Sequence, residues 1–336
     1  MRIKSFILGI SLVFLSTGCT LQLPLPFTGK TSSENNSSNS SNNSSESNGG
    51  YSSTQSSSGS SSSSGGSSSS STPTPTPDPD NPEDVNQYYA SISDSLTGAT
   101  LKTALFNKIK ITNAGWSYDG LWTAYKTTDV RPDGKHFWDI YSDTTMYTLD
   151  DKRINASYDE EGDSINREHV IPQSSFKEAA PMKSDIHHVL PSDGYVNNRR
   201  SNYPHGNVTG TVKYTSNDGC KLGTGTGNTT VFEPMSHYKG DIARIYFYFV
   251  TCYENKMSSN TFSGFNQTSY PSIKPVYLDL YLQWHLEDPV SQKELDRNNA
   301  AYVGQKNRNP FIDRPSYACK IWGDYDDTTR TLCGLK

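Results

Sequence analysis

Hydrophobic and polar positions divide the chain of 336 residues into three parts. An apolar run fills positions 6–15, whereas positions 20–84 consist mainly of Ser, Asn, Gly, Thr and Pro. From 85 to 336, apolar residues return in the spacings that folded elements require. The middle part has little to bury and predicts a disordered linker. The last part, roughly 250 residues, is long enough for one globular domain with a substantial core.

The clearest helical pattern covers 240–256. Ile242, Ile245, Phe249 and Cys252 recur there at spacings of three and four, which place them on one face of a helix. Further apolar residues between them widen this face. The pattern therefore predicts a helix that lies largely within the core.

Two more helices are predicted towards the C-terminus. The first covers 278–286. The second should start after Asp288, whose carboxylate can cap the free amides, with Pro289 in the first helical position. This helix should run to about Tyr302.

Two short segments, 169–171 and 187–190, are apolar or β-branched, and each is followed by a proline. Both are predicted as strands. After the second proline, Ser192 is the expected cap of a short helix that ends near Ser201. The predicted order is strand, long connection, strand and helix, in a unit small enough to bring its ends together.

The N-terminus has the features of an export signal. Arg2 and Lys4 precede the apolar run, which is too short to span a membrane stably, and small residues lead to Cys19. Residues 1–19 are therefore predicted to be a signal peptide with a segment that resembles a bacterial lipobox. Cys19 would then be lipidated and would attach an extracellular, cell-surface lipoprotein to the membrane. The alternative is a secreted protein cut near Gly18.

Four further cysteines, Cys220, Cys252, Cys319 and Cys333, allow up to two disulfides in any of three connectivities. Some of them could instead be buried thiols, as in the predicted helix that carries Cys252. No Cys-x-x-Cys pair is present, which argues against a zinc ribbon or a thioredoxin-like redox site.

Charge sets a limit on how nucleic acid could bind. The chain has 30 Lys and Arg against 35 Asp and Glu, a net charge of −5. There is no overall positive field, so a nucleic-acid ligand would have to meet a local basic patch. This balance argues against a purely electrostatic binder.

Candidate chemistry is concentrated in the stretches 166–169, 185–188 and 197–202. They contain histidine, which can remove a proton near neutral pH, oxygen ligands for a hard divalent cation, and arginine for phosphate. The combination favours phosphodiester cleavage. His187 and His188 are adjacent on a predicted strand and would point to opposite faces, so a structural role is preferred to a shared zinc ion.

Several separated blocks resemble one family. Asn-Arg-Glu-His at 166–169, Asp-Ile-His-His-Val-Leu-Pro at 185–191 and Gly-Tyr-Val-Asn at 194–197 are similar to the bacterial endonuclease I family, secreted or periplasmic nucleases with a ββα-metal (His-Me finger) site. Further similar blocks are 137–142, 200–202, 232–234, 239–244, 284–285, 288–291 and 307–313. The resemblance implies an α+β, largely helical single domain, 85–336, around a ββα core.

Carried over by position, the resemblance implies that His169 is the general base and that Glu168 and Asn197 bind one Mg²⁺, for which Mn²⁺ or Ca²⁺ could substitute. The implied activity is sequence-nonspecific hydrolysis of DNA, RNA or both by a monomer, leaving 5′-phosphate and 3′-hydroxyl ends. Arg200 shares a predicted helix face with Asn197, so it could contact phosphate or form a structural ion pair. His205 departs from the family, in which Phe is common.

Two other classes of function stay open. A catalytically inactive, nucleic-acid-binding surface lipoprotein would retain the fold without the chemistry, although the base and both ligands are present. A surface adhesin would rest on the Ser-rich linker and on the abundance of Tyr alone. Cleavage and retention assays separate these classes from a nuclease.

Overall fold

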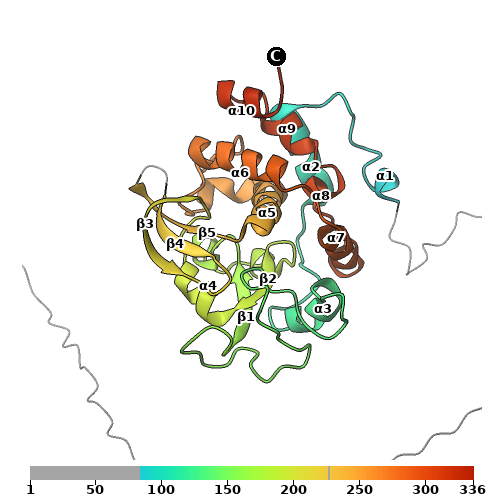
Figure 1. The fold of residues 1–336 in the computed structure, drawn as a ribbon. Helices are drawn as coiled ribbons and strands as arrows, with labels where there is room; N and C mark the ends of the chain where they lie inside the picture. The colour runs from blue at the N-terminus through green and yellow to red at the C-terminus, as the bar shows by residue number, and fades with distance from the viewer. Residues whose placement is uncertain (1–83, 226–227) are drawn as a thin grey trace, which may run out of the picture. The chain divides into compact units, whose positions relative to one another are not determined.

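Helix α5, Lys239–Cys252, is buried along almost its whole length. The Tyr246 ring stacks on Tyr281 with 4.4 Å between ring centroids, and the Phe247 ring stacks on Trp322 at 4.7 Å. The helix predicted over 240–256 is confirmed, and the chain tightens into 3-10 turns where the α-helix ends. Figure 1 shows α5 in the interior of the domain, with C-terminal helices around it.

The computed structural model describes residues 84–225 and 228–336. The predicted signal peptide with Cys19 and, apart from Asp84, the predicted linker lie outside these residues. The other helices are α1 (Val85–Tyr88), α2 (Gly98–Ile109), α3 (Leu121–Thr128), α4 (Gly194–Arg200), α6 (Pro275–Glu287), α7 (Gln292–Gln305), α8 (Pro310–Asp313), α9 (Tyr317–Trp322) and α10 (Asp327–Leu332).

Both predicted C-terminal helices are present as α6 and α7, but the expected start of α7 is wrong. Its cap is Ser291, whose hydroxyl accepts from the Glu294 amide at 3.3 Å while the Glu294 carboxylate accepts from the Ser291 amide at 2.9 Å. This reciprocal capping satisfies two free amides, and the helix therefore begins after Ser291 and not after Asp288. Asp288 instead ends α6, and its carboxylate accepts from the Gly240 amide at 2.8 Å.

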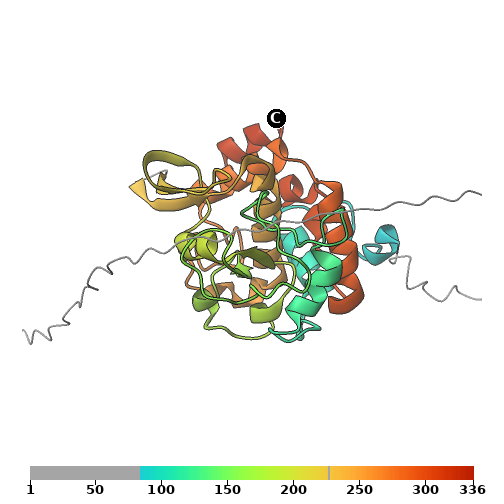
Figure 2. The ribbon, with the colours of Figure 1, turned by 60° about the horizontal axis from the view of Figure 1, so that its bottom comes forward.

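The strands form two small antiparallel sheets. One pairs β1 (Ile165–His169) with β2 (Val189–Asp193), and the other has the order β3 (Val208–Thr215), β4 (Lys221–Gly225) and β5 (Thr230–Glu233). In Figure 1 the three-stranded sheet lies to one side of α5 and α6, and Figure 2 shows it projecting from the helices. Strands β1 and β2 lie at the end of the domain opposite α9 and α10. The predicted α+β, largely helical domain is confirmed.

The predicted strands exist, but their boundaries are wrong. Strand β1 ends at His169 instead of starting there, because the polar run before it pairs with β2 despite lacking an apolar pattern. Strand β2 starts at Val189 and continues through Pro191, which lies opposite Arg167. Within the described residues no third strand pairs with the outer edge of β2, so a proline that lacks an amide is tolerated there.

Helix α4 follows β2 directly and completes a ββα unit. Its cap is Asp193, not the predicted Ser192: the Asp193 carboxylate accepts from the amides of Tyr195 and Val196 at 2.9 and 3.0 Å. Asp193 also receives a hydrogen bond from the Tyr147 hydroxyl at 2.7 Å. The direction in which α4 leaves β2 is therefore fixed by a buried carboxylate.

One disulfide, Cys319–Cys333, lies within residues 84–225 and 228–336, where Cys220 and Cys252 are buried thiols. The bridge joins α9 to the end of α10. Cys252 lies in α5 as a buried thiol, which was one of the two alternatives predicted for it. Among the described residues, no helix combines the length and the apolar character needed to cross a membrane.

The loop before α3 docks on α7 through two glycines. Gly115 has a positive φ of 76°, and a Cβ on it would meet the Gly304 carbonyl oxygen at 2.6 Å. A Cβ on Gly304 would meet the Trp116 ring at 1.8 Å. The bare backbone of α7 at this point therefore lets Trp116 pack closely, which places the loop that continues to Tyr118.

Replacement of Gly304 by Ala should destabilise the domain by about 2 kcal/mol, because relief of the overlap with Trp116 outweighs the roughly 1 kcal/mol of helix propensity that Ala gains. Chemical denaturation measures the change. Val303→Ala is the matched control, since Val303 is 56% exposed on the same helix and its truncation should cost less than about 0.5 kcal/mol. Equal stability of Gly304→Ala and the wild type would contradict the packing described.

Candidate active site

An open pocket of about 420 Å³ lies over β1 and α4. Glu168 and His169 reach it from β1, and Asn197 and Arg200 reach it from α4. Tyr118 contributes from the loop before α3. The ββα unit thus brings all four predicted site residues to one pocket, although they span both ends of a long connection in sequence.

His169 is oriented by a backbone carbonyl. Its Nε2 lies 3.0 Å from the Lys183 oxygen, which can only accept, so Nε2 carries the proton and Nδ1 has a free lone pair. Burial lowers the pKa of His169 to about 3, and the nearby His188 ring adds to the shift. The imidazole is therefore neutral at physiological pH, the form that can accept a proton.

Glu168 is buried and held on one side only. Its Oε1 accepts from the Tyr141 hydroxyl at 2.6 Å and lies 2.8 Å from the Arg200 guanidinium. No hydrogen bond from the described residues reaches Oε2. Burial raises the pKa of Glu168, while the Arg200 charge and the Tyr141 hydroxyl oppose that shift. One carboxylate oxygen is thus committed to the protein and the other is available to a cation.

A hydrogen-bonded chain of buried side chains stands behind Glu168. Because the Tyr141 hydroxyl donates its proton to Glu168, Nε2 of His205, 2.7 Å away, must donate to the Tyr141 oxygen. Nδ1 of His205 is then the acceptor for the Tyr246 hydroxyl at 2.9 Å. Burial lowers the pKa of His205 well below its ordinary value, which keeps one ring nitrogen as donor and the other as acceptor. The Tyr141 proton is then directed to Glu168.

The sequence reasoning missed this chain. Tyr141 lies in one of the blocks that carry the family resemblance, but its distance of 27 positions from Glu168 gives no local pattern that links them. His205 was noticed only as a departure from Phe. The structure accommodates the imidazole because two tyrosine hydroxyls satisfy both of its nitrogens.

Asn197 presents its amide oxygen to the pocket. Its Nδ2 donates to Oδ1 of Asn166 at 2.7 Å and to the Arg167 carbonyl at 3.3 Å. Both partners are acceptors, which fixes the orientation of the amide group. No hydrogen bond from the described residues reaches the oxygen of Asn197, while its nitrogen ties α4 to β1.

Arg200 forms the structural ion pair that was one of its two predicted roles. Its side chain is only 1% exposed, and besides Glu168 it binds the backbone oxygens of His169, at 2.8 Å, and Val170. Its Nε has no partner among the described residues. The guanidinium thus joins α4 to the end of β1 and to the carboxylate at once.

The other histidines of the motif point into the protein. His187 Nε2 lies 3.2 Å from the Asn307 oxygen, and His188 Nε2 lies 2.7 Å from the Met182 oxygen. Both residues precede β2 instead of lying in it, so the prediction that they project to opposite faces of a strand is wrong. Asp185 accepts from the hydroxyls of Tyr248 and Tyr253 at 2.9 and 2.6 Å and thereby orients its neighbours.

The pocket fits a hard cation that takes few ligands from the protein. Within residues 84–225 and 228–336 no group of three or more His, Cys, Asp or Glu side chains could hold a metal ion. Glu168 and Asn197 nevertheless each leave one oxygen uncommitted at the pocket. Mg²⁺ commonly binds one or two protein oxygens and completes its shell with phosphate and water, so this donor set suits it.

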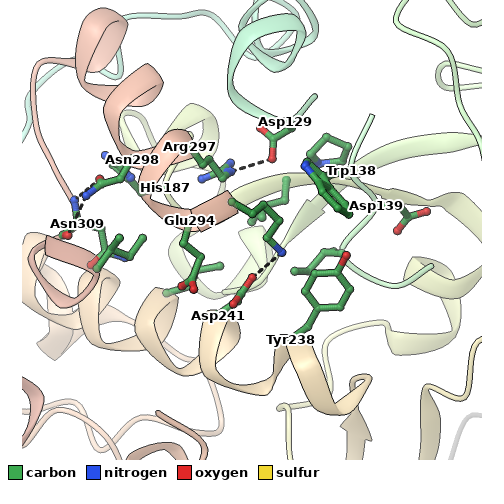
Figure 3. Close-up of a pocket in the computed structure, with 16 residues that line it drawn as sticks. Asp129, Trp138, Asp139, His187, Tyr238, Asp241, Glu294, Arg297, Asn298 and Asn309 are labelled. Atoms are coloured by element: carbon green, nitrogen blue, oxygen red, sulfur yellow. Dashed lines mark hydrogen bonds and ion pairs between the residues drawn. The ribbon is translucent and has the colours of Figure 1, made fainter. Parts of the chain in front are cut away.

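A second cavity, about 30 Å³ in volume, lies between α5 and α7 (Figure 3). Arg297 binds Asp129 at 2.7 Å, and Lys293 binds Asp241 at 2.6 Å across it. This volume holds about one or two water molecules. Glu294 is paired with Arg244, and Asp139 accepts from the amides of Tyr141 and Asp193. The acids of this cavity are thus engaged by the surrounding helices and loops, so the cavity belongs to the packing of the domain and not to the chemistry of the open pocket.

Fold and site together define a class of protein: an α+β domain in which a ββα unit presents an imidazole, a carboxylate and an amide to one pocket. Residues 97–316 match the endonuclease I family. The chain belongs to this family.

The similarity to individual proteins extends over much of the chain. An extracellular ribonuclease of Bacillus amyloliquefaciens is 33% identical over 250 residues, which cover 71% of this chain and 79% of that protein. An extracellular ribonuclease of Bacillus subtilis (strain 168) is 32% identical over 250 residues, with the same coverage. An extracellular deoxyribonuclease of Aeromonas hydrophila is 26% identical over 133 residues, 40% of this chain and 51% of that protein.

The buried histidines should make stability depend on pH. Burial lowers the pKa of His187 to about 4, so below about pH 6.5 the unfolded chain binds a proton that the folded protein refuses. The stability is present above pH 6.5 and is lost as the pH falls towards 4. In urea unfolding, the loss between pH 7 and pH 5 should be about 2 kcal/mol smaller in His187→Gln than in the wild type. The same loss in both proteins would contradict this assignment.

Proposed function

We propose that the protein is an exported, sequence-nonspecific endonuclease that hydrolyses phosphodiester bonds in DNA, RNA or both, with one Mg²⁺. The observation that carries the proposal is the convergence of three uncommitted atoms on one pocket: Nδ1 of His169, Oε2 of Glu168 and Oδ1 of Asn197. An acceptor for a proton beside two oxygen ligands is what metal-assisted attack of water on a phosphodiester requires.

Family membership supports the same class of reaction. The family is generally metal-dependent, and relatives are named as extracellular ribonucleases and as an extracellular deoxyribonuclease. These names include both kinds of nucleic acid. Contacts to a phosphate backbone carry little base information, which is consistent with nonspecific cleavage.

In the proposed mechanism, His169 takes a proton from water at Nδ1, since Nε2 is occupied by the Lys183 carbonyl. The water oxygen forms a bond to phosphorus, in line with the bond to the 3′ oxygen that breaks. The leaving 3′ oxygen takes up a proton from solvent, so the products carry 5′-phosphate and 3′-hydroxyl ends. Glu168 and Asn197 would hold Mg²⁺, which supplies positive charge for the phosphate and the leaving oxygen. Mn²⁺ or Ca²⁺ could occupy the same oxygen ligands.

Arg200 acts in this proposal as a positioning residue. Its buried guanidinium keeps Oε1 of Glu168 in place and binds the His169 carbonyl, so it fixes the metal ligand and the base relative to each other. It also balances the charge of Glu168, since both side chains of this pair are almost completely buried. In this proposal Arg200 acts through Glu168 and His169 and does not contact phosphate directly.

Export is proposed from the sequence, with residues 1–19 as signal, 20–84 as linker and 85–336 as the nuclease domain. Lipidation of Cys19 would make the protein a cell-surface lipoprotein, and its absence would make it a freely secreted monomer. The extracellular relatives support export as such. Metabolic labelling with a palmitate analogue separates the two forms.

His169→Ala should lower the rates of plasmid nicking and RNA degradation by about 10²-fold to 10⁴-fold in Mg²⁺, because Glu168, the carboxylate that remains in the pocket, is assigned to the metal and not to the proton. EDTA should abolish cleavage by the wild type. His237→Ala is the control: its side chain is 53% exposed and pairs with Asp143 outside the pocket. Cleavage by His169→Ala at the wild-type rate would remove the assignment. If the wild type retains nucleic acid but does not cleave it, the inactive binder is favoured. If it neither retains nor cleaves nucleic acid, the adhesin is favoured.

Tyr141→Phe tests the buried support of the metal ligand. Loss of the hydroxyl removes a donor from Oε1 of Glu168 and should raise the Mg²⁺ concentration needed for half-maximal cleavage by about 10-fold to 100-fold. High Mg²⁺ should restore most of the rate, because the base is untouched. A lower rate that Mg²⁺ does not restore would show that Tyr141 acts otherwise.

A further inference from the structure

Aromatic side chains border the pocket near both ends of β1. The Tyr118 ring lies 5.7 Å from the ring of His169, the last residue of the strand. Tyr158 lies against Gly194, whose amide binds the carbonyl of Ser164, just before the strand begins. The two ends of a five-residue strand are on the order of 13 Å apart. Both tyrosines line the pocket, with the proposed base and metal ligands on the elements between them.

Tyr118 is held in place by Arg167. The guanidinium lies 3.6 Å from the centre of the Tyr118 ring and donates to the Tyr118 carbonyl at 2.7 Å and to Asp119 at 3.2 Å. The Arg167 side chain is only 7% exposed, so it serves as a support and not as a mobile surface cation. The ring is therefore fixed at the edge of the pocket before any ligand arrives.

Tyr158 begins a row of aromatic rings that leads away from the pocket. A Cβ on Gly194 would meet Tyr158 at 3.0 Å, so the missing side chain allows the ring to approach α4 closely. The Tyr158 ring contacts Tyr195 at 6.5 Å, and Tyr195 contacts Tyr214 of β3 at 6.2 Å. The exposed Arg199 lies 4.5 Å above the Tyr195 ring. We call Tyr158, Tyr195 and Tyr214 the tyrosine row.

The charges around these rings do not form a continuous basic surface. Lys183, 5.1 Å from the Tyr118 ring, and Arg199 are cations beside the pocket, but Asp119, Asp159 and Glu160 are exposed acids on the same loops. A duplex is held mainly through phosphates on two strands and hides its base faces. Flat rings with scattered cations instead suit the exposed bases of a single strand.

We propose that the protein binds a single-stranded segment of DNA or RNA across the pocket, with bases stacked on Tyr118 on one side and on the tyrosine row on the other. The inference rests on the proposed function and adds its substrate class. Tyr118 and Tyr158 fix the strand on both sides of the phosphate to be cleaved. Unpaired nucleic acid is then preferred to duplex of the same sequence.

The test is equilibrium binding to the full-length His169→Ala protein in Mg²⁺, which separates recognition from cleavage. The probes are a fluorescent single strand in DNA and RNA versions, its duplex, and an abasic strand with the same phosphates. The single strands should bind at least about tenfold more tightly than the duplex. Adding Tyr118→Leu or Tyr158→Leu should weaken single-strand binding by on the order of tenfold and leave abasic-strand binding unchanged.

Matched variants separate stacking from folding. Tyr118→Phe and Tyr158→Phe keep the ring and should retain binding, whereas Tyr325→Leu, in the turn between α9 and α10, should have no effect. Equal weakening for the normal and abasic strands, or tighter binding of the duplex, would overturn the proposal. Cleavage by the wild type is measured in parallel. If the wild type cleaves but the tyrosine variants bind as the parent does, this inference alone is contradicted. If the wild type does not cleave, the proposed function is contradicted.

Discussion

The buried ion pair between Arg200 and Glu168 is the contact on which the geometry of the pocket depends. Arg200 comes from α4 and Glu168 from β1, so the pair closes the ββα unit on itself. Because the guanidinium also binds the carbonyls of His169 and Val170, one side chain joins the end of the strand to the carboxylate. A charge buried so completely is tolerated only when it is paired and hydrogen-bonded. The same constraint that stabilises the unit therefore aligns the proposed base with the proposed metal ligand.

Neutral, buried histidines supply much of the remaining support. His205 is hydrogen-bonded to Tyr246 through one ring nitrogen and to Tyr141 through the other. His188 lies beside the ring of His169, the proposed base. Burial keeps these imidazoles uncharged by disfavouring their protonated forms. Each then offers one donor and one acceptor, which suits a relay between hydroxyls and carbonyls better than a cation would. The domain gains directed hydrogen bonds in an apolar setting without adding charge near the pocket.

The spacing of apolar residues predicted the helices that are buried along a regular face. It did not predict elements that are held by particular partners elsewhere in the chain. Helix α5 was found because its apolar residues repeat at helical spacing, whereas β1 was misplaced because Asn166 and Arg167 show no apolar pattern. The resemblance to a family selected Glu168, His169 and Asn197, and the structure brings all three to one pocket. The orientation of Arg200 and the Tyr141 hydrogen bond depend on contacts between segments distant in sequence. No local pattern encodes such contacts, so sequence reasoning left them open.

The register of the β1–β2 ribbon limits how this region can change in length. Glu168 lies opposite Leu190 and His169 opposite Val189, and the side chains of a strand alternate between its faces. One inserted or deleted residue within β1 would exchange the faces on which the carboxylate and the imidazole project. Every side chain in the strand could be correct in identity and still be on the wrong side. Variation in length should therefore be confined to the connection between the strands and excluded from the strands themselves.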